Sequence, residues 1–232
     1  MTTFTGNSKG KWRTSWFGRR LNRARGFFEL LLMKLYRRQE DFHLLKTLAL
    51  HEKEFNFKPS EVFMIYSLAK AKSGAPGDFA EVGVFRGLSA EVICRAKRDK
   101  PLWLFDTFEG LPDVGDKDSM FAKGTYCGSL DSVRNRLAPW RGVSLVKGLF
   151  PQSAEPIRDK TFAFVHLDVD LYESTKASLE FFYPRMEKGG VILTHDYGQA
   201  EGVKKAFNEF FAGNHENMIE LPMSQCMVIK GL

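Results

Sequence analysis

Short apolar runs alternate with amphipathic stretches along the chain from residue 77 onward. Runs of this length predict buried strands, and apolar positions that recur every three or four residues predict helices between them. We expect strands within residues 78–85, 101–108, 142–148, 161–170 and 190–198, and helices within residues 87–98, 129–140, 172–186 and 201–213. Ser129 is the expected N-cap of the second helix. This alternation predicts a doubly wound α/β fold with a mostly parallel sheet.

Three further segments, before, within and after this alternation, also have recognisable sequence patterns. Residues 217–232 predict a C-terminal antiparallel hairpin with Pro222 near its turn, which brings the expected sheet to seven strands. Residues 40–76 are expected to form helices that lead into the first strand. Residues 109–128 form a polar loop with four glycines and three aspartates. A loop of this length inside a compact domain is more often a functional lid than a connector.

Charge divides the chain into two parts. Residues 1–38 contain ten lysines and arginines and a single acid, Glu29, which leaves 24 basic and 27 acidic residues in the rest. The pI of 9.2 therefore comes from the N-terminus, and the body lacks the basic charge of a nucleic-acid-binding protein. A chain of 232 residues can form one large α/β domain with a short extension. We place a basic helical extension at residues 1–50 and the domain at residues 51–232.

The basic N-terminus is open to three interpretations. It can pack as a helix on the body or on a second subunit of a homo-oligomer, lie on a membrane surface through residues 9–38, or contact RNA or another polyanion. It has no long apolar region followed by a small-residue cleavage site, so we expect no secretory signal. No apolar run reaches the roughly 18 residues that a transmembrane helix needs.

The cysteines and several histidines lack the spacing of a functional site. Three cysteines without CxxC spacing are expected to be reduced core thiols of a cytoplasmic protein: Cys94, Cys127 and Cys226. Three histidines without acidic neighbours are expected to be structural: His43, His51 and His215.

The first strand ends in a glycine turn, Glu81-x-Gly83-x-x-x-Gly87, at the edge of the sheet where ligands bind in this fold class. A dinucleotide site needs a second glycine where this chain has Phe85, because the backbone must approach a pyrophosphate there. Glu81 would repel a pyrophosphate but suits a cationic ligand. Asp106 lies 25 residues after Glu81, where a carboxylate can accept hydrogen bonds from ribose hydroxyls. An adenosine with a cationic, phosphate-free tail is S-adenosylmethionine.

Acidic residues also follow the fourth and fifth strands at this edge. They are Asp168 and Asp170 after the fourth strand, and Asp196, preceded by His195, after the fifth. Clustered carboxylates without a nearby lysine or arginine suit a hard divalent cation, Mg²⁺ first. We expect Asp168 and Asp196 to converge, whereas Asp170 either caps the next helix or supports its neighbour. His166, just before the turn, is interpreted as a satisfied core histidine.

Four segments within roughly residues 50–232 resemble the macrocin and mycinamicin O-methyltransferases: EVGVFRGLSA, LFDTFEGLPD, HLDVDLYESTKASLEFFYPRMEKGGVILTHDYG and GVKKAFNEFF. The resemblance implies a Rossmann-like methyltransferase fold and metal-dependent methylation of sugar hydroxyls. It implies cofactor contacts from Glu81, Gly83, Phe85 and Ser89 at the methionine end, Asp106 at the ribose, and Gly148, Leu149 and Phe150 near the adenine. The implied metal ligands are Asp168, His195 and Asp196.

His195 departs from the family pattern, which usually has two adjacent acids at this place. Histidine is a poor ligand for Mg²⁺ but a good one for transition metals. Two roles for His195 therefore stay open. It can ligate a metal such as Mn²⁺, or it can act as a general base, since an unperturbed imidazole has a pKa of roughly 6.5.

The predicted function is methyl transfer from S-adenosylmethionine, assisted by Mg²⁺ or Mn²⁺, to a hydroxyl of a sugar or glycosylated small molecule. The acceptor is expected to offer a vicinal diol, and Asp168 and His195 are the expected catalytic residues. The alternative is a metal-independent methyltransferase for a lipid, polysaccharide or RNA that the basic N-terminus recruits. Two other classes compete: a nicotinamide oxidoreductase, which the bulk of Phe85 opposes, and a non-catalytic binding protein with a decayed site at His195.

Overall fold

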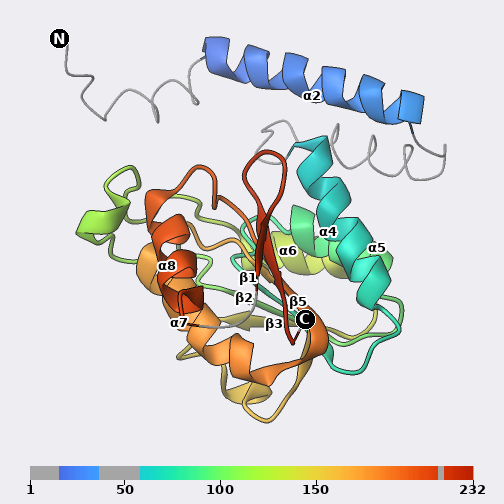
Figure 1. Ribbon diagram of the computed structural model, residues 1–232, viewed down its shortest axis with the longest axis vertical. Helices are drawn as coiled ribbons and strands as arrows, with labels where there is room; N and C mark the ends of the chain where they lie inside the picture. The colour runs from blue at the N-terminus through green and yellow to red at the C-terminus, as the bar shows by residue number, and fades with distance from the viewer. Residues whose placement is uncertain (1–15, 37–57, 214–216, 232) are drawn as a thin grey trace. The chain divides into compact units, whose positions relative to one another are not determined.

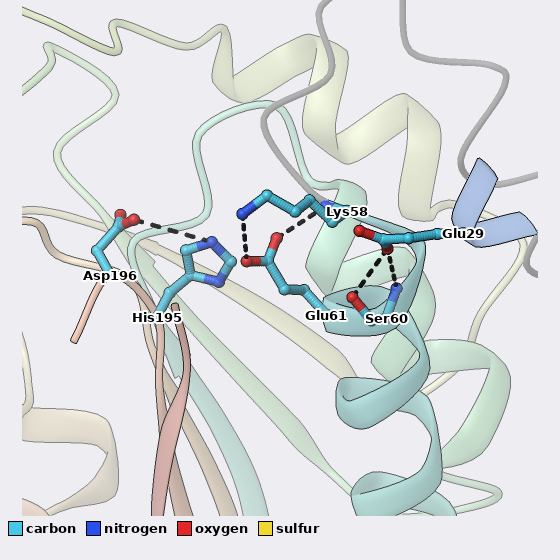
Figure 2. Close-up of polar contacts among 6 residues, drawn as sticks. All are labelled: Glu29, Lys58, Ser60, Glu61, His195 and Asp196. Atoms are coloured by element: carbon cyan, nitrogen blue, oxygen red, sulfur yellow. Dashed lines mark hydrogen bonds and ion pairs between the residues drawn. The ribbon is translucent and has the colours of Figure 1, made fainter. Parts of the chain in front are cut away.

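The computed structural model describes residues 16–36, 58–213 and 217–231 (Figure 1). The chain divides into two compact units, residues 1–64 and 65–232. The first unit contains helix α2 (Trp16–Tyr36) and the start of helix α4 (Pro59–Lys72). Ser60 joins these helices, since its backbone N–H and hydroxyl donate to Glu29 (Figure 2). The predicted boundary at residue 50 lies outside the described residues, as do the helices expected between residues 40 and 57.

The second unit contains a seven-stranded sheet with the order β3-β2-β1-β4-β5-β7-β6. Five strands pair in parallel: β1 (Asp78–Val82), β2 (Leu102–Asp106), β3 (Val143–Lys147), β4 (Phe162–Leu167) and β5 (Met186–Thr194). The antiparallel hairpin consists of β6 (Met218–Glu220) and β7 (Cys226–Ile229), and β7 pairs with β5. The predicted doubly wound, mostly parallel fold with a closing hairpin is confirmed.

Helices cover both faces of this sheet (Figure 1). Helices α5 (Leu88–Ala96) and α6 (Leu130–Leu137) lie on one side, and α7 (Tyr172–Phe182) and α8 (Glu201–Phe211) lie on the other. The predicted cap of α6 is confirmed, because Ser129 Oγ accepts a hydrogen bond of 3.3 Å from the Ser132 N–H. In the described part of the chain, no helix is long and apolar enough to cross a membrane.

The junction between α7 and β5 differs from the prediction. Helix α7 ends at Phe182, and a short 3-10 helix, Tyr183–Arg185, follows it. Pro184 explains the early end, because proline has no N–H to donate within an α-helix. Strand β5 begins at Met186, so the segment 188–190, expected to stop the helix, lies inside the strand.

An aromatic core between the sheet and helices α7 and α8 holds the strands in place. All six residues of β4 are buried, as expected for a parallel strand covered on both faces. The Phe150 ring stacks on Phe182 with their centroids 5.1 Å apart, and Phe182 in turn packs edge-on against Phe162 of β4. Because Phe162 is the first residue of β4, this packing anchors the start of the strand, at the end opposite Asp168.

The cysteines are free thiols, as predicted. Burial raises the pKa of both Cys94 and Cys226 to about 12, so these two thiols stay protonated in the core. The prediction is wrong for the environment of Cys127, which is exposed because it lies in the loop of residues 109–128.

Candidate functional site

The ends of β1 and β4 meet where the strand order reverses, which is the place where open α/β sheets form their ligand crevice. Gly83 follows β1 with a φ of 86°, and a Cβ added to it would lie 1.9 Å from the carbonyl oxygen of Asp168. The Asp168 N–H in turn donates to the Val82 carbonyl at 2.9 Å. Only glycine fits this approach, so the predicted glycine turn and the predicted catalytic Asp168 are direct neighbours.

Asp106 holds the first turn in shape. Its Oδ2 accepts hydrogen bonds from the backbone N–H groups of Val84 and Phe85 at 2.7 and 2.8 Å, and its Oδ1 accepts one from Phe108 at 2.6 Å. These bonds support the left-handed backbone of Phe85, whose φ is 49°. An ionised carboxylate offers roughly four acceptor positions. Asp106, predicted as the ribose ligand, therefore orders the turn and keeps capacity for one further hydrogen bond.

Glu81 and His166 form a buried pair across β1 and β4. They are register partners in the two parallel strands, and His166 Nδ1 lies 2.7 Å from Glu81 Oε1. Both side chains have an exposed fraction of 0%. The interpretation of His166 as a core histidine is confirmed, but the side chain is only partly satisfied, because its Nε2 has no hydrogen-bond partner among the described residues. The partner of its Nδ1 is a residue that was predicted to contact the cofactor.

Asp168 has an unusual electrostatic environment. Burial raises the pKa of its carboxyl from 3.8 to about 6, and the charges of Asp196 and Glu81 act in the same direction. The imidazoles of His195 and His166 act against this shift, and these two rings lie 6.3 Å apart. At neutral pH the Asp168 carboxyl is therefore mostly ionised, and it takes up a proton when the pH falls to about 6.

His195 and Asp196 follow β5 beside Asp168. His195 is buried, and its Nε2 lies 4.0 Å from Asp196 Oδ1 (Figure 2). Its backbone N–H donates to the Leu167 carbonyl at 2.8 Å, which ties it to the end of β4. Asp196 has a φ of 56°, a left-handed conformation that aspartate adopts more readily than most residues. This geometry turns the chain from β5 toward α8.

The three predicted metal ligands lie at one edge of the sheet. Asp168, His195 and Asp196 come from the ends of two adjacent strands, β4 and β5. Within residues 16–36, 58–213 and 217–231, however, no group of three or more His, Cys, Asp or Glu side chains is placed to hold a metal ion. The side chains as they stand therefore do not form a metal site.

The predicted cap of α7 at Asp170 is wrong. Leu171 occupies the N-cap position, and the Tyr172 N–H donates to Oδ1 and Oδ2 of Asp118 at 3.2 and 3.0 Å. Asp170 precedes this cap with a left-handed φ of 60°. The acceptor for the first turn of α7 thus comes from the loop of residues 109–128. The local sequence around α7 gives no signal for it, because Asp118 and Tyr172 are 54 positions apart.

The loop of residues 109–128 also folds back on itself and reaches the first turn. The Leu111 N–H donates to the Thr125 carbonyl at 2.8 Å. A Cβ on Gly128 would lie 2.2 Å from the Phe85 carbonyl oxygen, and the Tyr126 ring lies 5.7 Å from the Phe85 ring. The loop therefore contacts the turn that is predicted to bind the cofactor.

The remaining predicted cofactor residues lie beside α5 and β3. Ser89 is buried in the first turn of α5. Gly148 follows β3, and its N–H donates to the Asp106 carbonyl at 2.9 Å. Leu149 is exposed, whereas the Phe150 ring lies in the core.

The three histidines that were expected to be structural lie outside the described residues: His43, His51 and His215.

Comparison with known proteins assigns the chain to a family. Residues 67–228 match the family model described as macrocin O-methyltransferase (TylF). Demethyldecarbamoylnovobiocin O-methyltransferase of Streptomyces niveus is 31% identical over 157 residues, which are 60% of this chain and 60% of that protein. The 8-demethyl-8-(2,3-dimethoxy-alpha-L-rhamnosyl)-tetracenomycin-C 4'-O-methyltransferase of Streptomyces olivaceus is 33% identical over 141 residues, 53% of this chain and 54% of that protein.

The solved structure of the O-methyltransferase NovP has the same fold, with a TM-score of 0.64 at 27% identity over 73% of this chain and 78% of that chain. The chain matches between half and two thirds of the length of the two curated relatives. The family model itself covers well over half of the chain. The chain therefore belongs to the macrocin O-methyltransferase (TylF) family.

Proposed function

We propose that the chain transfers a methyl group from S-adenosylmethionine to a hydroxyl of a sugar or a glycosylated small molecule. The observation that carries the proposal is the glycine turn at the switch point, where Gly83 lies against Asp168 and an acid, Glu81, precedes it. Family membership supports the reaction class. The sugar acceptor is supported by the relative whose name specifies a rhamnosyl-tetracenomycin.

The residues of the first turn fit this cofactor. Gly83 and Gly87 shape the turn at positive φ, and Phe85 occupies the place where a dinucleotide site needs glycine. When bound, S-adenosylmethionine supplies a methyl group that its sulfonium makes electrophilic. The residues that would hold it are Glu81, Gly83, Phe85 and Ser89 at the methionine end, Asp106 at the ribose, and Gly148, Leu149 and Phe150 on the adenine side.

Asp168 and His195 perform the proton chemistry in this proposal. An aliphatic hydroxyl does not ionise at neutral pH, so its proton must pass to a base as its oxygen is methylated. His195 accepts that proton on its imidazole. The carboxylates of Asp168 and Asp196 stabilise the resulting imidazolium, since opposite charges attract strongly in a site with little water. Because the pKa of Asp168 is about 6, this carboxylate is ionised above neutral pH.

A divalent cation is a separate part of the proposal. The carboxylate oxygens of Asp168 and Asp196 suit Mg²⁺, and the nitrogen of His195 suits Mn²⁺. No catalytic step is assigned to the cation, because the side chains as they stand do not form a three-ligand site in the described part of the chain. Loss of activity on treatment with EDTA, with recovery on addition of Mg²⁺ or Mn²⁺, would show that a cation takes part. Full activity after EDTA would favour the metal-independent alternative.

The N-terminus is proposed to make contacts beyond the active site. Helix α2 exposes large apolar side chains in a strongly basic segment: Phe27, Phe28, Leu31, Leu32 and Leu35. This composition suits an anionic membrane surface, contacted through residues 9–38, and homo-oligomerisation is a second use of the same apolar side chains. Co-sedimentation with phosphatidylglycerol vesicles tests the first, and sedimentation velocity in the absence of vesicles tests the second.

The reaction is tested by incubating the full chain with methyl-labelled S-adenosylmethionine and a panel of rhamnosylated and other glycosylated acceptors. We expect S-adenosylhomocysteine to form together with a methyl ether on a sugar oxygen, located by mass spectrometry. A second sample with NADH and the same acceptors serves as the control for an oxidoreductase. Acceptor-dependent NADH oxidation without methyl transfer would overturn the proposal.

A further inference from the structure

We propose that His166 is a positioning residue, which fixes the Glu81 carboxylate so that it receives the amino group of S-adenosylmethionine. The inference rests on the proposed function and names a residue that neither the glycine turn nor the predicted catalytic set includes. His166 does not reach the reacting atoms in this account, and it acts only through Glu81.

The pair is polar in the middle of apolar strands. The neighbours of Glu81 along β1, Ala80 and Val82, are buried, and so are the neighbours of His166 along β4, Val165 and Leu167. A carboxylate at such a position costs stability unless its oxygens are hydrogen-bonded. The structure thus places a costly group two residues before Gly83, close to the predicted ligand crevice.

The hydrogen bond between the two residues satisfies only part of the carboxylate. His166 Nδ1 lies 2.7 Å from Glu81 Oε1, and because an ionised carboxylate only accepts hydrogen bonds, Nδ1 is the donor. Glu81 Oε2 is buried and has no hydrogen-bond partner among the described residues. A buried oxygen left in this state destabilises the fold, because it has lost its hydrogen bonds to water without replacement. A ligand with an N–H donor would remove that destabilisation.

The chemistry of this oxygen selects one end of the cofactor. A carboxylate repels the carboxylate of the methionine moiety and attracts its ammonium, and an N–H donor to a carboxylate forms a strong, charge-assisted hydrogen bond. By holding Oε1, His166 keeps the carboxylate group from rotating and leaves Oε2 as the oxygen for that ammonium. Specificity for the amino-acid end of the cofactor therefore depends on His166 as well as on Glu81.

Binding of two ligands distinguishes a positioning role of His166 from a general effect of its replacement on the fold. S-adenosylhomocysteine carries the amino group, whereas 5′-methylthioadenosine has the same adenosine and sulfur but lacks the amino acid. Both are titrated calorimetrically into the full chain, in the wild type and in three variants: His166→Leu, which removes the donor, His166→Asn, which keeps an N–H near the position of Nδ1, and Glu81→Gln, which removes the charge.

We expect His166→Leu to bind S-adenosylhomocysteine on the order of tenfold to a hundredfold more weakly, the size of a lost charge-assisted hydrogen bond, with unchanged affinity for 5′-methylthioadenosine. His166→Asn should recover most of the loss. If His166→Leu does not fold, Glu81→Gln, which keeps an acceptor oxygen for His166, should show the same selective loss.

Equal weakening of both ligands in the His166 variants would overturn the positioning role, because it would indicate a structural effect alone. Unchanged binding of S-adenosylhomocysteine in His166→Leu would overturn it as well. A wild-type chain that binds neither ligand would contradict the proposed function, a result distinct from either failure of the positioning role.

Discussion

At the scale of single residues, the buried carboxyl of Asp168 lowers the stability of the folded chain when it is ionised. This carboxyl has a pKa of about 6 in the folded chain, against 3.8 without the fold. The folded state therefore binds this proton more tightly than the unfolded state does. It follows that the contribution of Asp168 to the free energy of unfolding is most favourable below roughly pH 4 and declines as the pH rises through about 6.

Replacing this acid should therefore stabilise the protein while inactivating it. We expect Asp168→Asn to raise the free energy of unfolding at pH 8 by about 1–2 kcal/mol, because each pKa unit corresponds to about 1.4 kcal/mol and part of the shift is screened by solvent. Methyl transfer should be lost. Urea unfolding at pH 8 and pH 4 measures the effect, which should vanish at the lower pH.

The matched control for this variant is Asp159→Asn, since Asp159 is exposed and its replacement should change stability little at either pH. A lower stability of Asp168→Asn than of the wild type at pH 8 would contradict the assigned electrostatics.

Gly83 is the second residue whose identity follows from its contacts. We expect Gly83→Ala to lower the free energy of unfolding by about 2–4 kcal/mol, because the added Cβ meets the Asp168 backbone at a left-handed φ. Binding of S-adenosylhomocysteine should be lost as well. Gly74→Ala is the control, since a Cβ on Gly74 meets nothing within 4 Å. Thermal unfolding that leaves both variants alike would argue against the close approach of β1 and β4.

At the scale of secondary-structure elements, the loop of residues 109–128 is attached to helix α7 through Asp118. Asp118→Ala removes the acceptor of the Tyr172 N–H and should lower the free energy of unfolding by about 1–2 kcal/mol, as for a lost helix cap. It should also make the loop easier to cleave by trypsin at Lys117 and Lys123. Limited proteolysis followed by mass spectrometry measures this.

Asp116→Ala is the control for the loop, because Asp116 is an exposed residue of the same 3-10 helix. Equal protection of the loop in both variants would show that Asp118 does not hold it.

Much of the element order was predictable from the sequence, because buried parallel strands and amphipathic helices leave clear periodic patterns. The prediction was wrong at both ends of helix α7. Pro184 ends α7 before the glycines that were expected to end it. The cap from Asp118 could not be predicted from residues near α7, since it depends on how a distant loop folds.

The candidate site was predictable in position but not in its internal contacts. The carboxyl ends of parallel strands share one edge, so Glu81, Asp106, Asp168 and His195 could be assigned to it from the sequence. The pairing of Glu81 with His166 additionally requires the strand order and register of β1 and β4. The isolated polar residue in each apolar strand was the signal that could have indicated this pair.

At the scale of the whole molecule, the strand order explains why residues far apart in the sequence form one site. Strand β1 lies between β2 and β4, so the glycine turn receives Asp106 from one neighbour and Asp168 from the other. Strand β5, which pairs with β4, adds His195 and Asp196 at its end. Methyl transfer from S-adenosylmethionine requires that this shared edge bind an adenosine ligand without a pyrophosphate.

The most direct test of the account is therefore a calorimetric titration of the full wild-type chain with S-adenosylhomocysteine, with NADH titrated under the same conditions. The account predicts saturable one-to-one binding of S-adenosylhomocysteine and no binding of NADH. Binding of NADH, or a folded chain that does not bind S-adenosylhomocysteine, would contradict it.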